Sequence, residues 1–171
     1  MSSPKTWHMV AASNTSPISN LALIGRLDLL RIQFQEVWIP DAVQRELHLL
    51  PVSDGRASIQ QAMDAGWLRR RSIANRALVA VLVTDLDQGE AEAIALATEI
   101  SADVLLIDER DGRARARQAG VVVRGVLGVL IRAKAMGLVS SMKDEIRSLR
   151  AVAKFFIAPS LEEEVLRSVG E

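Results

Sequence analysis

The sequence predicts an α/β fold in which a central parallel sheet is covered by helices on both faces. Short apolar runs rich in Val, Ile and Leu alternate with longer stretches of helical periodicity, as in folds built from successive strand–helix units. One run, VLLI at 104–107, is apolar at every position, which is typical of a strand buried on both faces. No internal repeat or domain boundary interrupts this alternation. We therefore expect one domain over residues 9–171, after a flexible leader at 1–8.

The composition is that of a globular protein. The chain has 171 residues, of which 49% are hydrophobic and 25% charged, which suffices for a sizeable core and excludes a disordered chain. Lys plus Arg and Asp plus Glu both number 21, so the net charge is +0 and only a local basic patch would bind nucleic acid. No apolar run approaches the roughly 18–20 residues of a membrane span, and the N-terminus lacks a signal-peptide pattern. We expect a cytoplasmic protein without a membrane segment.

The side chains available for metal binding are restricted to oxygen ligands. The chain has no Cys, which excludes disulfides and thiolate metal sites. Its two histidines, His8 and His48, are far apart and in no metal-binding spacing. Any metal ion in this protein would therefore be held by oxygens, as Mg²⁺ and Mn²⁺ are.

Polar residues, proline and glycine mark the expected elements in the first half of the chain. Their order is strand 8–13, helix 17–25, helix 26–32, strand 36–40, helix 41–50, helix 56–65, a strand or extended segment at 67–73, and helix 75–83. The helix at 17–25 illustrates the signals, because Pro17 suits its first turn, Gly25 its end and the polar residues 14–16 its N-cap. The apolar run 75–83 fits either helix or strand, and we favour helix.

The second half of the chain contains the most clearly marked helix, at 88–100. Asp87 suits its N-cap, and Glu90 lies three residues later, as in a capping box. The elements expected after it are strand 104–107, helix 112–119, buried strand 121–123, helix 126–136, helix 140–153, a short strand at 155–157 and a final helix from Pro159.

Oxygen-bearing side chains follow several of the expected strands. They are Asn14 after the first strand, Glu46 in the helix after the second, Glu90 in the first turn of the helix at 88–100, and Asp108 and Glu109 after VLLI. Strand ends of this kind hold the site in open α/β sheets. Carboxylates crowded at one sheet edge repel one another, and a bound cation neutralises them. Mg²⁺ held there can activate a water for attack on a phosphodiester.

Each of these residues also has a purely structural interpretation. Glu90 can complete a capping box, Asp108 can cap the following helix, Glu46 can face solvent, and Asn14 can cap the first helix. The functional interpretation therefore depends on their joint placement. Other chemistries are not indicated, since the chain has no GxGxxG, GxxxxGK[ST] or GxSxG pattern.

Five segments, in this order along nearly the whole chain from Val10, resemble a known family. They are SNTSPISNLALIGRLDLL (13–30), VWIPDAVQREL (37–47), LDQGEAEAIALA (86–97), VLLIDERDGRARARQAGV (104–121) and GVLGVLIRAKAMGLV (125–139). The family is the PIN domain, the nuclease fold of VapC-type toxins in prokaryotic toxin–antitoxin pairs. The resemblance implies a three-layer α/β/α sandwich on a parallel sheet, and Mg²⁺- or Mn²⁺-dependent cleavage of RNA by an acidic cluster.

The resemblance also assigns site residues. It matches Asn14, Glu46 and Glu90 to the first three acidic positions, Asp108 or Glu109 (with Asp111 the weaker candidate) to the fourth, and Thr15 and Ser16 to polar residues that support the first acid. By this correspondence Asn14, Glu46, Glu90 and Asp108 would bind the metal, with Glu109 as a further catalytic candidate. Asn14 departs from the family pattern because it replaces an aspartate. An amide oxygen can ligate Mg²⁺, but more weakly than a carboxylate does.

Two groups of arginines are candidates for binding nucleic acid. Arg110, Arg113, Arg115 and Arg117 follow the fourth acidic position, and a second group lies at 69–71. At helical spacing Arg113 shares a face with Arg110 and with Arg117, so we expect these three to bind RNA. The alternative is a solvated basic helix face.

Three functional hypotheses follow. The leading one is a metal-dependent ribonuclease that acts as a toxin, and here the resemblance implies a homodimer and a small antitoxin partner. The second, suggested by Asn14, is a catalytically inactive PIN-like module with an RNA-binding or regulatory role. The third is an unrelated doubly wound α/β protein that binds a small molecule and uses its acids as helix caps.

Overall fold

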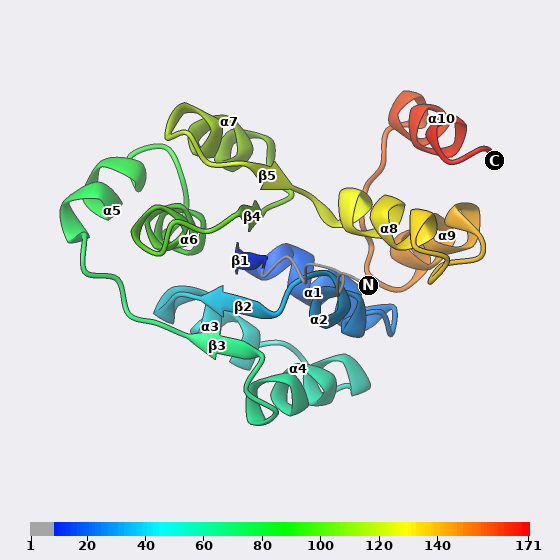
Figure 1. Cartoon of the computed structure of the whole chain (residues 1–171). Helices are drawn as coiled ribbons and strands as arrows, with labels where there is room; N and C mark the ends of the chain where they lie inside the picture. Colours follow the sequence, from blue (N-terminus) through cyan, green and yellow to red (C-terminus); the bar gives the residue numbers. More distant parts are fainter. Residues whose placement is uncertain (1–8) are drawn as a thin grey trace, which may run out of the picture.

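The computed structural model describes residues 9–171 and has a five-stranded, fully parallel central sheet (Figure 1). The strands lie in the order β3-β2-β1-β4-β5. Their bounds are β1 Val10–Ser13, β2 Glu36–Ile39, β3 Leu68–Arg70, β4 Val104–Leu106 and β5 Val123–Arg124. The order reverses direction at β1, the innermost strand, so β1 ends between the ends of β2 and β4. Such a switch point is where doubly wound sheets bind their ligands.

Ten helices within residues 9–171 surround the sheet. They are α1 Thr15–Leu23, α2 Asp28–Gln33, α3 Asp41–His48, α4 Asp54–Asp64, α5 Arg76–Leu82, α6 Gln88–Glu99, α7 Arg110–Gln118, α8 Val126–Ala135, α9 Met142–Ala151 and α10 Pro159–Ser168. The expected helix at 75–83 and the capping box of Asp87 and Glu90 are both confirmed. No helix among the described residues is long and apolar enough to cross a membrane.

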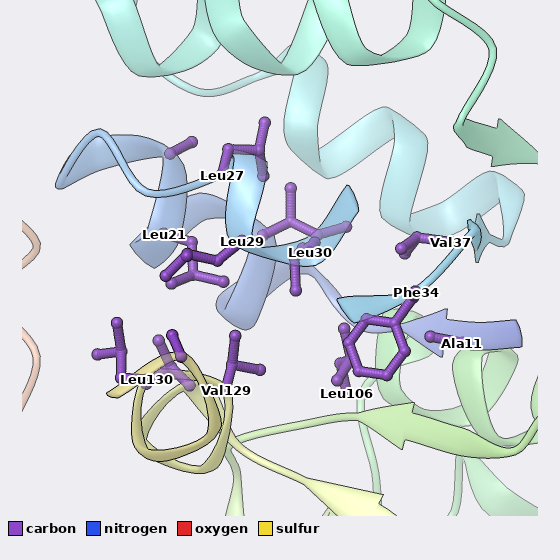
Figure 2. Packing of buried hydrophobic residues seen from close by; sticks show 14 of the residues in the cluster. Ala11, Leu21, Leu27, Leu29, Leu30, Phe34, Val37, Leu106, Val129 and Leu130 are labelled. Carbon is purple, nitrogen blue, oxygen red and sulfur yellow. The ribbon is translucent and has the colours of Figure 1, made fainter. Parts of the chain in front are cut away.

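Two hydrophobic clusters lie on opposite faces of the sheet, which confirms the predicted α/β class. Successive residues of a strand point to opposite faces, and accordingly Ala11 belongs to one cluster and Ala12 to the other. The larger cluster includes residues of α1, α2, α4, α8 and α9, and the smaller one residues of α5, α6 and α7. Figure 2 shows the larger cluster, where Leu30, Phe34 and Leu130 are all but fully buried.

Two strand predictions differ from the structure. The expected buried strand at 121–123 is wrong, because only Val123 and Arg124 pair with β4 and Val122 is 63% exposed. Its position at the edge of the sheet explains why this strand is neither buried nor long. The predicted strand at 155–157 does not form; the segment lies in the connection between α9 and α10, and Phe155 N donates to Leu149 O at the end of α9. The predicted leader at 1–8 lies outside the described residues.

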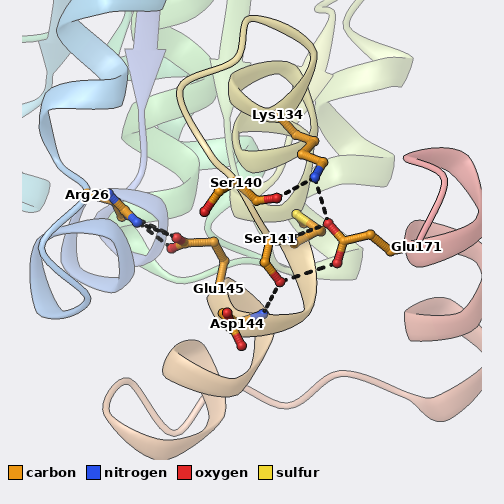
Figure 3. Close-up of polar contacts among 8 residues, drawn as sticks. Arg26, Lys134, Ser140, Ser141, Asp144, Glu145 and Glu171 are labelled. Atoms are coloured by element: carbon orange, nitrogen blue, oxygen red, sulfur yellow. Dashed lines mark hydrogen bonds and ion pairs between the residues drawn. The ribbon is translucent and has the colours of Figure 1, made fainter.

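The carboxylates of Glu145 and Glu171 connect the C-terminal helices to the rest of the domain (Figure 3). Glu145 in α9 accepts hydrogen bonds from Arg26 Nε at 3.0 and 3.1 Å, which ties α9 to the connection between α1 and α2. Glu171 accepts bonds from the backbone N–H groups of Met142 (2.7 Å) and Lys143 (3.1 Å) and pairs with Lys134 Nζ at 2.8 Å. A carboxylate at the first N–H groups of α9 is favoured by the helix dipole.

This arrangement makes the stability of the C-terminal part pH-dependent. The hydrogen bond from Lys134, then those from the Met142 and Lys143 N–H groups, lower the pKa of Glu171 to about 2. An unfolded glutamate titrates near about 4.3, so the stabilisation is complete above that pH and is lost as the pH falls toward 2. We expect Glu171→Gln to lower the melting temperature at pH 7, with the difference from wild type shrinking between about pH 4.5 and pH 2. Melting curves across this range test it, with the exposed Glu163→Gln as control; a pH-independent difference would contradict it.

Candidate acidic site

The site lies where β1 and β4 end side by side. These strands are parallel neighbours with Ser13 opposite Leu106, and Asn14 N donates to Leu106 O at 2.9 Å. The residues that follow each strand therefore meet at one edge. Asn14 Nδ2 donates to Glu109 Oε2 at 3.2 Å, so residues 95 positions apart in sequence are in direct contact.

Asn14 has a buried side-chain oxygen without a partner. The residue is 4% exposed, and no described residue donates a hydrogen bond to its Oδ1. It stands at the N-cap position of α1 but its side chain makes no capping bond, so the structural interpretation of Asn14 as a helix cap does not hold. Its NH₂ group faces Glu109, which fixes the orientation of the amide. A buried acceptor left unpaired costs about 1–3 kcal/mol, a cost that a bound cation or water would remove.

Glu46 and Asn14 face a common space beside Gly89. A Cβ placed on Gly89 would lie 2.6 Å from Glu46 Oε1 and 3.2 Å from Asn14 Oδ1, and any other residue there would displace the two oxygens. Thr15 Oγ1 hydrogen-bonds to the other oxygen, Glu46 Oε2, which leaves Oε1 directed at the space. Gly89 was not predicted as a site residue, although a glycine in the first turn of the helix at 88–100 is unusual and was a signal in the sequence.

Glu90 borders the same edge from α6. It is 7% exposed and completes the capping box, accepting from Asp87 N at 3.2 Å. Burial is the main cause that raises the pKa of Glu90, and the charges of Asp87, Glu109 and Asp111 raise it further, against the lowering effect of the Asp87 N–H. Glu90 therefore both caps its helix and adds to a concentration of negative charge.

Asp108 connects three elements at the end of β4. Its Oδ1 accepts from Val126 N at 2.7 Å, and its Oδ2 accepts from Ser16 Oγ at 2.8 Å and Asn20 Nδ2 at 3.5 Å. Asp108 thus caps α8. The interpretation of Asp108 as a cap of the helix that directly follows it, α7, is wrong. Burial raises the pKa of Asp108, and the bonds from Val126 and Ser16 oppose this. Glu109 is exposed and accepts one hydrogen bond, from Asn14. The carboxylate of Glu109 therefore accepts fewer hydrogen bonds than that of Asp108.

The arrangement fits a hard cation with few protein ligands. Among residues 9–171 no three carboxylate or histidine side chains converge in a way that would hold a metal ion. Mg²⁺, however, is usually held by one or two carboxylates and keeps several of its waters. Asn14 Oδ1 and Glu46 Oε1, which share the space beside Gly89, are oxygen ligands of that kind.

Another buried carboxylate, Glu92, was not predicted and supports the helix that bears Glu46. It is 2% exposed, and its oxygens accept from Ala42 N (3.0 Å), Gln88 Nε2 (2.7 Å) and Arg76 Nη1 (3.3 Å). The bond to Ala42 caps the first turn of α3 from α6. The segment EAEAIALA gave a signal, since Glu92 follows Glu90 within an otherwise apolar stretch of helix.

The arginines differ in their pairing. Arg113 Nη1 and Asp108 Oδ1 would lie 3.4 and 2.8 Å from a Cβ on Gly125, so Arg113 approaches the acidic edge. Three other arginines of the two groups form ion pairs: Arg115 with Asp85, Arg69 with Glu36 and Arg70 with Asp41. Arg110 and Arg117 are exposed on α7.

The raised pKa of Glu90 predicts that neutralising it stabilises the fold. A carboxyl whose pKa is higher in the folded than in the unfolded state costs stability at neutral pH, and the cost disappears as the pH falls and both states become protonated. Glutamine keeps an acceptor for the capping box. Glu90→Gln should therefore raise the melting temperature by about 1–4 °C in EDTA at pH 7, with a smaller gain at pH 4. A lower melting temperature than that of the Glu163→Gln control would contradict this.

Comparisons with known proteins agree with this description. A family model, "DUF3368: PIN domain", matches residues 10–171. A PilT N-terminus domain protein, SSO1118, of the hyperthermophilic archaeon Sulfolobus solfataricus P2 is similar in structure, with a TM-score of 0.53 and 22% sequence identity over 73% of this chain and 93% of that one. A search of curated proteins found no match. The chain therefore belongs to the PIN-domain family, whose fold is generally that of nucleases.

Proposed function

We propose that this protein is a metal-dependent endoribonuclease of the VapC-like branch, acting as the toxin of a type II toxin–antitoxin pair. The observation that carries the proposal is the unpaired, buried Oδ1 of Asn14, which faces Glu46 Oε1 across the space beside Gly89. Membership of a family of nucleases supports the reaction class. Membership also removes the hypothesis of an unrelated small-molecule binder.

The roles proposed for the site residues come from the family resemblance, and the contacts of Thr15 and Ser16 support them. Asn14, Glu46, Glu90 and Asp108 would hold Mg²⁺ or Mn²⁺, and Glu109 completes the acidic group. Such an ion lowers the pKa of a water and offsets the charge that grows on a phosphodiester during its hydrolysis. Thr15 holds one oxygen of Glu46, and Ser16 holds Asp108 between α1 and α8. These bonds orient the acids before any ligand binds, which is how an enzyme limits reorganisation during the reaction.

The remaining parts of the proposal rest on family resemblance. We infer a homodimer in the cytoplasm, a small antitoxin protein that inhibits it, and RNA contacts through Arg110, Arg113 and Arg117. Of these arginines, Arg113 has the strongest geometric support, since it lies next to the position of Asp108.

The second candidate function is that of a catalytically inactive PIN-like module with an RNA-binding or regulatory role. Asn14 favours it, because the amide removes one negative charge from the position where the family places an acid. The two candidates differ in a single measurable property, cleavage in the presence of a divalent cation.

Cleavage of a broad pool of single-stranded RNA by the purified protein tests the proposal. Wild type should cut with Mg²⁺ or Mn²⁺ and not with EDTA. Glu46→Gln and Glu90→Gln should each reduce the rate by about 100-fold or more, because each removes an acid from the site, while Glu163→Gln leaves it unchanged. Equal cutting by the two site variants and wild type would place the site elsewhere. Binding without cutting by wild type would favour the inactive module.

Direct measurement of metal binding tests the role of Asn14. Asn14→Asp should tighten Mn²⁺ binding by roughly tenfold in calorimetry, since a carboxylate is the stronger ligand for a hard cation. Asn75→Asp is a matched control, because Asn75 caps α5 away from the site. An affinity equal to that of the control would exclude Asn14 from the coordination sphere.

A further inference from the structure

A cavity of about 540 Å³ extends from the acidic edge toward the C-terminal part of the chain. Asp108 and Arg113 are among the residues that line it, and Phe155, Phe156 and Val165 line it from the C-terminal part. Leu127, Gly128 and Ile131 of α8 also line it. Its volume is in the range of pockets that hold a small molecule or one nucleotide.

The walls of the cavity combine arginines that have no ion pair among the described residues with an exposed aromatic ring. The guanidinium of Arg113 makes no ion pair or hydrogen bond with any described residue, whereas that of Arg115, two positions along α7, pairs with Asp85 at 2.9 Å. Phe156 is 84% exposed, the highest value for an aromatic side chain among residues 9–171. Apolar residues of α8 and α10 complete the wall, together with one further cation and one further acid, Arg124 and Glu164.

We propose that this cavity binds one nucleotide of a single-stranded RNA, with the phosphate at Arg113 and the base stacked on Phe156. The proposal rests on the proposed function, because it places the nucleotide next to the one that would be cut. A ring that stacks on bases and a guanidinium that binds phosphate are the two elements by which proteins hold single strands. A protein partner would also cover an exposed ring, but continuity with the acidic edge and the unpaired Arg113 favour a nucleic acid.

The loop that carries Phe156 is held in place rather than loosely attached. Phe155 N donates to Leu149 O, and Arg150 in α9 bonds both to Ile157 O at 3.2 Å and to the side chain of Glu162 in α10. These contacts fix the backbone on both sides of Phe156, while its ring remains exposed. A preorganised ring loses little conformational entropy when a base stacks on it.

Binding of a short fluorescein-labelled single-stranded RNA in EDTA, followed by anisotropy, tests the proposal independently of catalysis. Phe156→Ala should weaken binding by about tenfold, and Phe156→Trp should restore it and show quenching of the new tryptophan by the RNA. Leu49→Ala is the matched control, since Leu49 is an equally exposed apolar residue (83%) that does not line the cavity. Arg113→Gln should weaken binding and reduce the dependence of log Kd on log salt concentration by about one.

The outcomes separate this proposal from the proposed function. If Phe156→Ala binds RNA as Leu49→Ala does, or if wild type does not bind RNA in EDTA, the nucleotide subsite is excluded, and metal-dependent cleavage by wild type would still support the nuclease. If Phe156→Ala weakens RNA binding and wild type does not cleave with any divalent cation, the subsite stands and the nuclease does not. A change in oligomeric state with unchanged RNA binding would assign the ring to a protein interface and overturn the proposal.

Discussion

The parallel pairing of β1 with β4 is the constraint on which the site depends. Because Ser13 lies opposite Leu106, both strands end at the same level, so Asn14 and, two residues after Leu106, Asp108 emerge at one edge. A shift of one residue in this register would turn every side chain of one strand to the other face of the sheet and would offset Asn14 from Asp108 and Glu109 along the edge. Full burial of Ala11 and Ala12 on opposite faces holds the register, so the packing of the core also positions the acids.

Neutral hydrogen-bond donors orient the acids at this edge, and glycines leave room for their side chains. Thr15, Ser16 and the backbone N–H of Val126 each satisfy one carboxylate oxygen. Gly89 and Gly125 provide space, since a Cβ at either would come within 2.8 Å of a carboxylate oxygen. No described lysine or arginine forms a salt bridge with the acids of this edge, although Arg113 is close. The negative charge is therefore oriented but not neutralised within the described chain, which is the electrostatic condition that a cation relieves.

Much of this arrangement could be predicted from the sequence, and the remainder depends on long-range geometry. Helical periodicity and capping signals identified the helix at 88–100 and its capping box, because both are local properties of the chain. The partner of Asp108 was not predictable in this way: the choice between capping α7, which follows directly, and α8, 18 residues later, depends on where β5 lies. The segment 155–157 has the residues of a strand, but its backbone groups bond to α9 and not to the sheet, and a sequence pattern does not show which neighbour a segment will have. For the same reason the unpaired state of Arg113 and the space beside Gly89 emerged only from the structure.

The amide of Asn14 changes the site in a way that a simple loss of charge does not describe. An aspartate at this position would place a second carboxylate in hydrogen-bonding range of Glu109, and the two would repel. The amide instead donates to Glu109 Oε2 at 3.2 Å and keeps its oxygen on the side of Glu46. It thus carries no charge at this position and instead fixes the carboxylate of Glu109, beside the acids Glu46, Glu90 and Asp108. Asn14 therefore orients Glu109 as well as presenting an unpaired oxygen beside Glu46.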